Sequence, residues 1–553
     1  MGDGYRIEPT PAAQPVVGKL RARKRPKGAP THVRSWPLRP NPWQCRDMRT
    51  RFFTGVRVYN AVLGEFIARS RAVKSDLAWQ AARQLPSRTP AQRSARRAAF
   101  NAVAQAHGFA ADAAQSFGSG LRKSWVREHL PAQETQSVGA RAFDAVNQWH
   151  LGKKGKPRFK STKRGLRSLA TKDGNGALRP KTDAAGRLVG LQWGAGFVIG
   201  IAAPASTGRR GKEQQAELAE IEALIAAGKV LFTRIVRTVI AGRDTYRMQL
   251  VCDGHPTRRH SVGEGRVSFD LGPSQIAVSV ARSDGTWTGW IEPLADRLRL
   301  NTMRLRRRQR HLDRQHRAGS PDCFHSDGTH KTGGCHWRQR SHAAKRASTG
   351  AAEEHRRLAE HRKTLHGGLA NRLLSHGADL ACEKLDYVAW QKNFPRSVRD
   401  RAPGLLVAMM RRKAESAGGE RLYEFNTTTT ALSQTCLCGI KKKKPLSQRV
   451  HRCECGIKED RDLFSAYLGL HVHPGADGLD RLDLEAANNG WLLRRHDVDG
   501  RRSPAVAVSK RRGRRHPPSR RSAARIKARR ALKKRQSRST RTSPADQPTA
   551  IAA

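Results

Sequence analysis

The sequence predicts a multidomain α+β protein, in which a small β-barrel with an inserted helical block precedes a second sheet with a zinc-binding insert. Three observations lead to this fold class. Apolar residues recur at helical spacing in the block, and strand-like runs separated by turn residues follow it up to residue 253. Two matched cysteine pairs then lie between residues 436 and 455, ahead of a last apolar helix.

The composition indicates a polyanionic partner. The 553 residues include 106 Lys and Arg against 46 Asp and Glu, a formal net charge of +60, and so large an excess favours nucleic acid. No apolar run is long enough to cross a bilayer and residues 1–17 show no signal-peptide pattern, so we expect no membrane partner. The cysteines are clustered, which is typical of metal binding in a reducing cytoplasm.

The first half of the chain divides into four segments. Residues 1–28 are basic and rich in Pro and Gly, and they predict a flexible arm. Residues 29–45 are extended and are expected to supply a strand to the barrel of residues 152–263. Within that barrel the sequence predicts an amphipathic helix that ends at Gly228 and a turn at Gly242-Arg243-Asp244 between two strands. Residues 46–151 are helical, and one face of the first helix collects large apolar side chains: Val56, Tyr59, Val62, Leu63 and Phe66.

Residues 264–432 form a second system of strands and helices. A strand ending in Asp270, a glycine turn and two further strands precede basic helices, which is how an RNase H-like sheet begins. A strand through Glu383 and a helix opened by Pro403 complete this region.

Three segments make up the C-terminal part. Residues 433–458 hold the cysteine pairs, and residues 459–490 hold the last apolar helix. Residues 491–553 form a tail that has 18 Lys and Arg after residue 500 against a single Asp. We expect this tail to be disordered until it meets nucleic acid.

Four cysteines stand in two C-x-C-G units, and four thiolates converging from two tight turns suit a structural zinc ion. The predicted ligands are Cys436, Cys438, Cys453 and Cys455. Gly439 and Gly456 allow the backbone to fold back so that its amides face the sulfurs. A zinc knuckle usually has two residues between its cysteines and this chain has one, so His451 stays open as a substitute ligand. The alternative is four unpaired cysteines in a basic loop.

Three carboxylates far apart in the chain are candidate catalytic groups: Asp270, Glu383 and Asp462. The first two lie in apolar strands, where an unpaired charge is costly. Two Mg²⁺ ions roughly 3.5–4 Å apart, bridged by such acids, activate water and stabilise the leaving oxygen in phosphodiester cleavage. Asp460 competes for the third position, and the helix start favours Asp462. The alternative is that each acid is a surface charge or a turn cap.

Three stretches in this order resemble the split RuvC motifs and zinc insert of TnpB transposon nucleases and of their descendants, the type V CRISPR effectors: FDLGPSQIAV, ACEKLDY and CLCG…CECG…DRDLFSAYL. GKPRFK resembles the family's border between helical lobe and barrel. The resemblance covers residues 30–475 in order. The length favours a compact CRISPR effector, which acts in antiviral defence, over a transposon-encoded nuclease.

The resemblance implies a Mg²⁺-dependent, RNA-guided DNA endonuclease in the cytoplasm of a prokaryote, associated with the nucleoid when bound to DNA. Its partners would be a guide RNA and target double-stranded DNA next to a short adjacent motif. Asp270, Glu383 and Asp462 would be the catalytic, magnesium-binding acids, and the four cysteines would hold Zn²⁺.

The resemblance also names the segments. Residues 29–45 and 152–263 would form the wedge, an oligonucleotide-binding-like barrel, and residues 46–151 the recognition lobe. Residues 264–432 would carry RuvC motifs I and II, residues 433–458 the zinc-binding insert, and residues 459–490 motif III.

Two departures from the family pattern keep an alternative function open. The third motif usually reads D-x-N-A-A, and Phe464 stands at the Asn position; the cysteine pairs are each one residue short. The alternative is a guide-RNA-dependent DNA-binding effector with weak or nicking-only activity. A structural RNA-binding protein with accidental acids is disfavoured by the three ordered motifs. The sequence leaves open the guide, the adjacent motif and the oligomeric state.

Aromatic residues among basic ones are candidates for stacking on bases, with core packing as the alternative. They are Trp36, Trp43, Trp125, Trp149 and Phe159.

Overall fold

The computed structural model describes Pro26 and residues 28–494 with a few internal gaps. The residues left out between these bounds are 163–164, 258–259, 297, 299–301, 332–340, 419–421 and 446. Most of the predicted arm and nearly all of the predicted basic tail lie outside the described residues.

The chain divides into two compact units. One comprises Met1–His260 with Arg297–Leu365, and the other comprises Ser261–Asp296 with His366–Ala553. Both units contain helices and sheets, so the predicted mixture of the two is confirmed. Among the described helices, none is both long and apolar enough to span a membrane.

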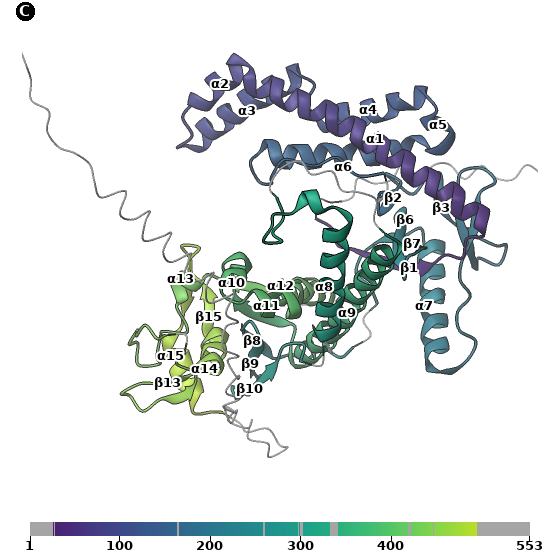
Figure 1. The fold of residues 1–553 in the computed structure, drawn as a ribbon. Coiled ribbons are helices and arrows are strands. Elements are labelled where there is room, and N and C mark those ends of the chain that lie inside the picture. Colours follow the sequence, from purple (N-terminus) through teal and green to yellow (C-terminus); the bar gives the residue numbers. More distant parts are fainter. Residues whose placement is uncertain are drawn as a thin grey trace, which may run out of the picture. The chain divides into compact units, whose positions relative to one another are not determined.

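The first unit contains a helical block that matches the expectation for this part of the chain (Figure 1). Its longest helix, α1, begins after Asn41, whose side chain accepts from the Gln44 amide in a capping box, with Pro42 in the first turn. All five apolar residues of the predicted face are buried. The helices are α1 Pro42–Ser75, α2 Leu77–Gln84, α3 Pro90–Ala106, α4 Ala111–Gly120, α5 Val126–His129 and α6 Ala132–His150.

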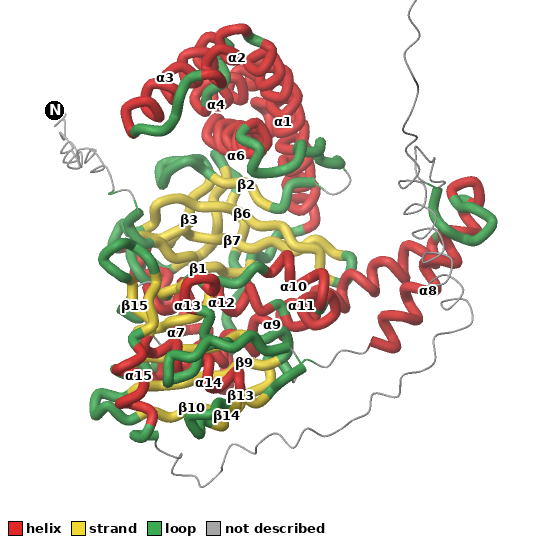
Figure 2. The backbone as a smooth tube through the Cα atoms, turned by 90° about the vertical axis from the view of Figure 1, so that its left-hand side faces the viewer, coloured by secondary structure: helices red, strands yellow, loops and turns green. Residues whose placement is uncertain are grey.

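The strands of the first unit form two sheets (Figure 2). A four-stranded antiparallel sheet has the order β1-β7-β6-β2, and a three-stranded sheet has the order β3-β4-β5. The strand expected from the extended N-terminal segment is confirmed, because β1 pairs with β7 along its length. The strands are β1 Thr31–Pro37, β2 Ser168–Ala170, β3 Leu178–Thr182, β4 Leu188–Trp193, β5 Val198–Gly200, β6 Val230–Ile240 and β7 Arg243–Asp253.

The turn between β6 and β7 lies earlier than the sequence indicates. The predicted turn was Gly242-Arg243-Asp244, whereas Ala241 and Gly242 make it, with φ of 49° and 82°. A two-residue hairpin loop of this kind needs left-handed backbone at both positions. Arg243 and Asp244 therefore belong to β7, where they start the strand.

Three further helices belong wholly or partly to the first unit. The predicted amphipathic helix is α7 Gly208–Ala226, and Gly228 follows it with a φ of 63°. The predicted basic helices are α8 Thr302–Gly319 and α9 His342–His376. Arg308 of α8 pairs with Glu354 of α9 at 2.9 Å.

The second unit is built on a five-stranded sheet of order β10-β9-β8-β11-β12. The first three strands are antiparallel neighbours, and β11 runs parallel to both β8 and β12. The strands are β8 Arg266–Leu271, β9 Gln275–Ala281, β10 Trp287–Pro293, β11 Asp379–Glu383 and β12 Tyr423–Phe425.

Helices cover both faces of this sheet. On one face, Phe269 and Cys382 are buried with Leu406 and Met410 of α12 Pro403–Ser416 and with the end of α9. On the other, Ala277 packs against α14 Arg461–Leu468. The remaining elements are α10 Tyr387–Asn393, α11 Pro395–Arg401, α13 Thr427–Thr430, β13 Val450–Arg452, β14 Lys458–Asp460, β15 Val472–Pro474, β16 Asp480–Leu482 and α15 Leu484–Trp491.

Candidate functional site

Asp270 and Glu383 lie at the same end of two neighbouring parallel strands. Cys382 of β11 is opposite Phe269 of β8, so the next residue on each strand is one of the two acids. Side chains alternate along a strand. Because Phe269 and Cys382 are buried on the α12 face, both carboxylates point to the face that α14 covers.

Asp462 reaches the same place from α14. Its helix packs on β9 through Ala277, and Ala277 is the cross-strand partner of Asp270. Asp460 has a different role, since its side chain accepts hydrogen bonds from the amides of Asp462 at 2.9 Å and Leu463 at 3.2 Å. Asp460 is thus the N-cap of α14, and Asp462 is the acid that joins the cluster.

The three carboxylates act on one another electrostatically. Burial, followed by the charges of Glu383 and Asp462, holds the pKa of Asp270 well above its usual range. Burial and the charge of Asp462 raise the pKa of Glu383 to about 7. Like charges gathered in a partly buried place disfavour the ionised form unless cations neutralise them. Carboxylate oxygens are the hard ligands that Mg²⁺ prefers.

Two arginines and an amide hold Asp462, which the sequence did not indicate. Arg461 lies 3.0 Å from Oδ1 of Asp462, and Arg449 lies 3.2 Å from Oδ2. Gln275 of β9 donates to the same Oδ2 at 3.1 Å. In the sequence, only the Asp-Arg-Asp run of residues 460–462 indicated an arginine next to Asp462. These groups offset the negative charge of the cluster and fix the direction of the carboxylate.

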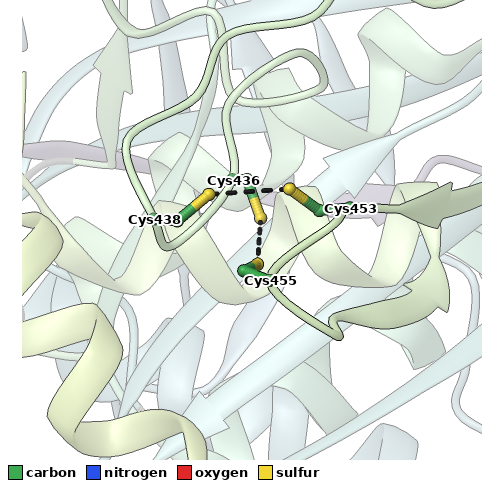
Figure 3. Close-up of side chains that lie close together, drawn as sticks. All are labelled: Cys436, Cys438, Cys453 and Cys455. Atoms are coloured by element: carbon green, nitrogen blue, oxygen red, sulfur yellow. Dashed lines mark hydrogen bonds between the residues drawn. The ribbon is translucent and has the colours of Figure 1, made fainter.

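The four predicted zinc ligands converge (Figure 3). Their sulfurs all lie within 4.8 Å of one another. Cys436 Sγ is 3.5 Å from Cys455 Sγ, and Cys438 Sγ is 3.5 Å from Cys453 Sγ. Tetrahedral zinc with Zn–S bonds of about 2.3 Å separates sulfurs by about 3.8 Å. The donors therefore fit Zn²⁺.

Each C-x-C-G unit is a tight turn, which explains how one intervening residue suffices. Gly439 N–H donates to Cys436 O at 3.0 Å, and Gly456 N–H donates to Cys453 O at 3.1 Å. Both glycines have positive φ, 83° and 90°. The backbone amide of Cys455 lowers the pKa of the Cys453 thiol to about 7, as expected where amides face the sulfurs.

His451 is not part of the cysteine cluster, so its possible role as substitute ligand is not needed. Its ring is 2% exposed and stacks on Phe464 with centroids 4.4 Å apart. Its Nδ1 contacts the ammonium of Lys444. Burial, with the nearby Lys444 charge, lowers its pKa to about 4, so the ring is neutral near pH 7.

Phe464, at the position where the family pattern has Asn, belongs to the core. Its side chain is 1% exposed and meets Trp491 at 5.4 Å as well as His451. Two residues along a helix turn the side chain by about 200°, so Phe464 points away from the Asp462 side of α14. The presence of Phe464 in place of the family's Asn thus affects the core packing beneath the cysteine hairpins.

The candidate stacking residues divide into two groups. Trp36 is 3% exposed and donates its indole N–H to Ala202 O at 2.9 Å, so it is a core residue. Trp149 is half-buried, with the Lys74 ammonium 5.3 Å from its ring centre. Trp43, Trp125 and Phe159 are exposed, at 57%, 41% and 61%.

Comparisons with known proteins give similarity at the level of structure alone. No protein-family model matches the chain, and no curated protein matches it. A cryo-EM structure of a Cas12f1–sgRNA–target DNA complex is similar with a TM-score of 0.40 and 10% identity, over 80% of this chain and 98% of that chain. A CRISPR–Cas12f ternary complex is similar with a TM-score of 0.25 and 13% identity, over 77% of this chain and 81% of that chain.

Proposed function

We propose that the protein is an RNA-guided DNA endonuclease that cuts with two metal ions held by Asp270, Glu383 and Asp462. The observation that carries the proposal is the meeting of these three acids. They come from motifs more than seventy residues apart in sequence, and their carboxylates perturb one another. The order of the five strands, three antiparallel and then two parallel, supports an RNase H-like RuvC domain.

In this proposal Asp270, Glu383 and Asp462 would hold Mg²⁺, which would supply activation of water and stabilisation of the leaving oxygen of the phosphodiester. Glu383 and Asp270 must give up their protons when the metal binds, because burial holds their pKa values high. Arg461 and Gln275 keep the Asp462 carboxylate turned toward the two strand ends.

The other predicted parts have supporting roles. The four cysteines hold Zn²⁺ and so fix the segment that carries Arg449 beside Asp462. The first unit, with its sheets and helical block, would serve as wedge and recognition lobe for a guide RNA and its target duplex. The guide RNA and the target duplex are polyanions, and the excess of Lys and Arg over Asp and Glu in the whole chain supplies the positive charge that binding them requires.

A second candidate function is guide-dependent DNA binding with weak or nicking-only cleavage. The arginine contacts on Asp462 favour it, because both oxygens of that carboxylate already have cationic partners. A metal ion has to compete with these partners for the ligand.

The test is to copurify the chain with its RNA, sequence that RNA and incubate the complex with matching duplex DNA and Mg²⁺. We expect magnesium-dependent cuts that Asp270→Asn abolishes while target binding persists. Asp477→Asn is the matched control, because it removes an exposed turn carboxylate paired with Arg481 in the same unit. Guide-matched binding without cuts would select the second candidate, and the absence of a defined RNA would contradict both.

A further inference from the structure

A cationic pocket lies in the first unit, whereas the acid cluster and the cysteines belong to the second. The pocket has a volume of about 510 Å³. Its lining combines two arginines, two threonines, an aromatic ring and a glycine: Arg49, Thr50, Phe53, Thr162, Gly165 and Arg237. A volume in this range accepts a small organic ligand.

One carboxylate holds both arginines of the pocket. Oδ2 of Asp244 accepts from Arg49 Nε at 3.0 Å, and Oδ1 accepts from Arg237 Nε at 2.9 Å. The Asp244 side chain is 10% exposed, while that of Arg49 is 63% exposed. The three groups sum to one positive charge. Asp244 starts β7, so the strand pairing fixes the position of the two guanidiniums.

The backbone leaves room for this arrangement at Gly165. The residue has a φ of 65°, and a Cβ there would lie 2.6 Å from Arg237 Nη1. Any larger residue would be strained by its backbone and would push the guanidinium aside.

An aromatic ring completes the pocket. Phe53 is half-buried on α1, one turn after Arg49, and lines the cavity. The guanidinium of Arg57, a further turn along α1, lies 5.0 Å from the ring centre of Phe53 and 5.8 Å from that of Trp125. The Phe53 ring and the two arginines thus line the same cavity, with Arg57 over one face of the ring.

We propose that this pocket binds one unpaired nucleotide, with its base on Phe53 and its phosphate at Arg49 and Arg237. Aromatic rings stack on any base, and guanidiniums are the preferred partners of phosphate oxygens. The inference rests on the proposed function only in taking nucleic acid as the partner. The nucleotide comes from the guide RNA or from a DNA strand.

The test uses the full chain and photo-crosslinking, which reports on this pocket rather than on the whole basic surface. Two short single strands serve as probes, an RNA with 5-iodouridine and a DNA with 5-iododeoxyuridine, and the crosslinked peptide is identified by mass spectrometry. We expect a crosslink in the peptide that contains Phe53, and the probe that gives the higher yield identifies the strand. Crosslinks confined to other peptides would overturn the proposal.

A second variant separates a built pocket from general charge attraction. Asp244→Asn makes the chain more positive, so simple attraction predicts an equal or higher yield at Phe53. The proposal predicts the opposite, a loss of about tenfold, because the arginine pair is no longer held. Asp183→Asn is the matched control, since it removes another carboxylate that pairs with an arginine, Arg187, in the same unit. An undiminished yield in Asp244→Asn would overturn the proposal.

Phe53→Leu tests the stacking surface. We expect about a tenfold lower yield at this peptide and no change with Phe394→Leu, which alters an exposed ring in the other unit. Thermal melting of each variant confirms that it is folded. DNA cleavage is scored separately. A chain that crosslinks at Phe53 but does not cut DNA would support the nucleotide pocket and contradict the proposed nuclease activity. A chain that cuts guide-matched DNA but gives no crosslink at Phe53 would support the nuclease activity and contradict the pocket.

Discussion

Arg449 lies 3.2 Å from Oδ2 of Asp462, so the loop between the two cysteine units touches the cluster of acids. Asp462 follows Arg449 by thirteen positions, and the second cysteine unit lies on the path between them. The metal proposed for the acids and the guanidinium therefore compete for one carboxylate oxygen.

This competition predicts the behaviour of Arg449→Ala. Because the Arg449 side chain is 55% exposed, its pairing with Asp462 is worth little, and we expect a roughly two- to fivefold lower half-saturating Mg²⁺ concentration. The change in metal affinity is measured by isothermal titration of the complex with Mn²⁺. Arg452→Ala removes the same charge from an exposed position three residues further on, at the end of β13, and should leave the affinity unchanged. A weaker metal affinity in Arg449→Ala would show that the arginine supports the site instead of competing for it.

Metal binding should also depend on pH through Glu383. Its pKa is raised to about 7, so below this pH the metal has to displace a proton. We expect the half-saturating Mg²⁺ concentration to rise at least tenfold for each unit of pH below about 7, because Glu383 and Asp270 both hold protons there. Mg²⁺ titrations of cleavage across this range give the dependence. A curve that is flat from about pH 6 to 8 would mean that Glu383 is already ionised without metal.

Local patterns predicted the elements of the site better than its contacts. The strand through Asp270 and the helix that begins near Asp462 were visible in apolar periodicity and in the helix-start pattern, which are properties of adjacent residues. The contact of Arg449 with Asp462 and the stacking of His451 on Phe464 depend on how a hairpin folds back, which no short pattern encodes. The turn at Ala241 was missed because Ala rarely takes a positive φ, and only the pairing of β6 with β7 imposes it there.

The cysteine cluster predicts a measurable zinc content. Wild-type protein should hold about one zinc ion per chain, and Cys453→Ser should lose it, because three thiolates bind zinc more weakly than four. Metal analysis by mass spectrometry after gel filtration gives the ratio. Cys45→Ser is the matched control, a half-buried free thiol in the first unit. An unchanged zinc content in Cys453→Ser would show that the cysteine cluster is not the zinc site.

Glu134 predicts a pH-dependent stability of the first unit. Its side chain is 0% exposed near the start of α6, and burial raises its pKa to about 7, with Trp193, Arg51 and Arg122 offsetting only part of this. The folded state therefore holds the proton more tightly than the unfolded state, and stability falls as pH rises from about 4.5 to about 7, then stays level.

The size of this effect follows from the pKa change, which corresponds to roughly 3 kcal/mol. Glu134→Gln keeps the shape of the side chain but cannot ionise, so we expect it to raise the melting temperature at about pH 8 and to leave it nearly unchanged at about pH 5. Glu128→Gln, at an exposed position of α5, should shift neither value. Equal melting temperatures for Glu134→Gln and wild type at about pH 8 would mean that the charged carboxylate is well accommodated, and Arg51 and Arg122 would then be the groups that stabilise it.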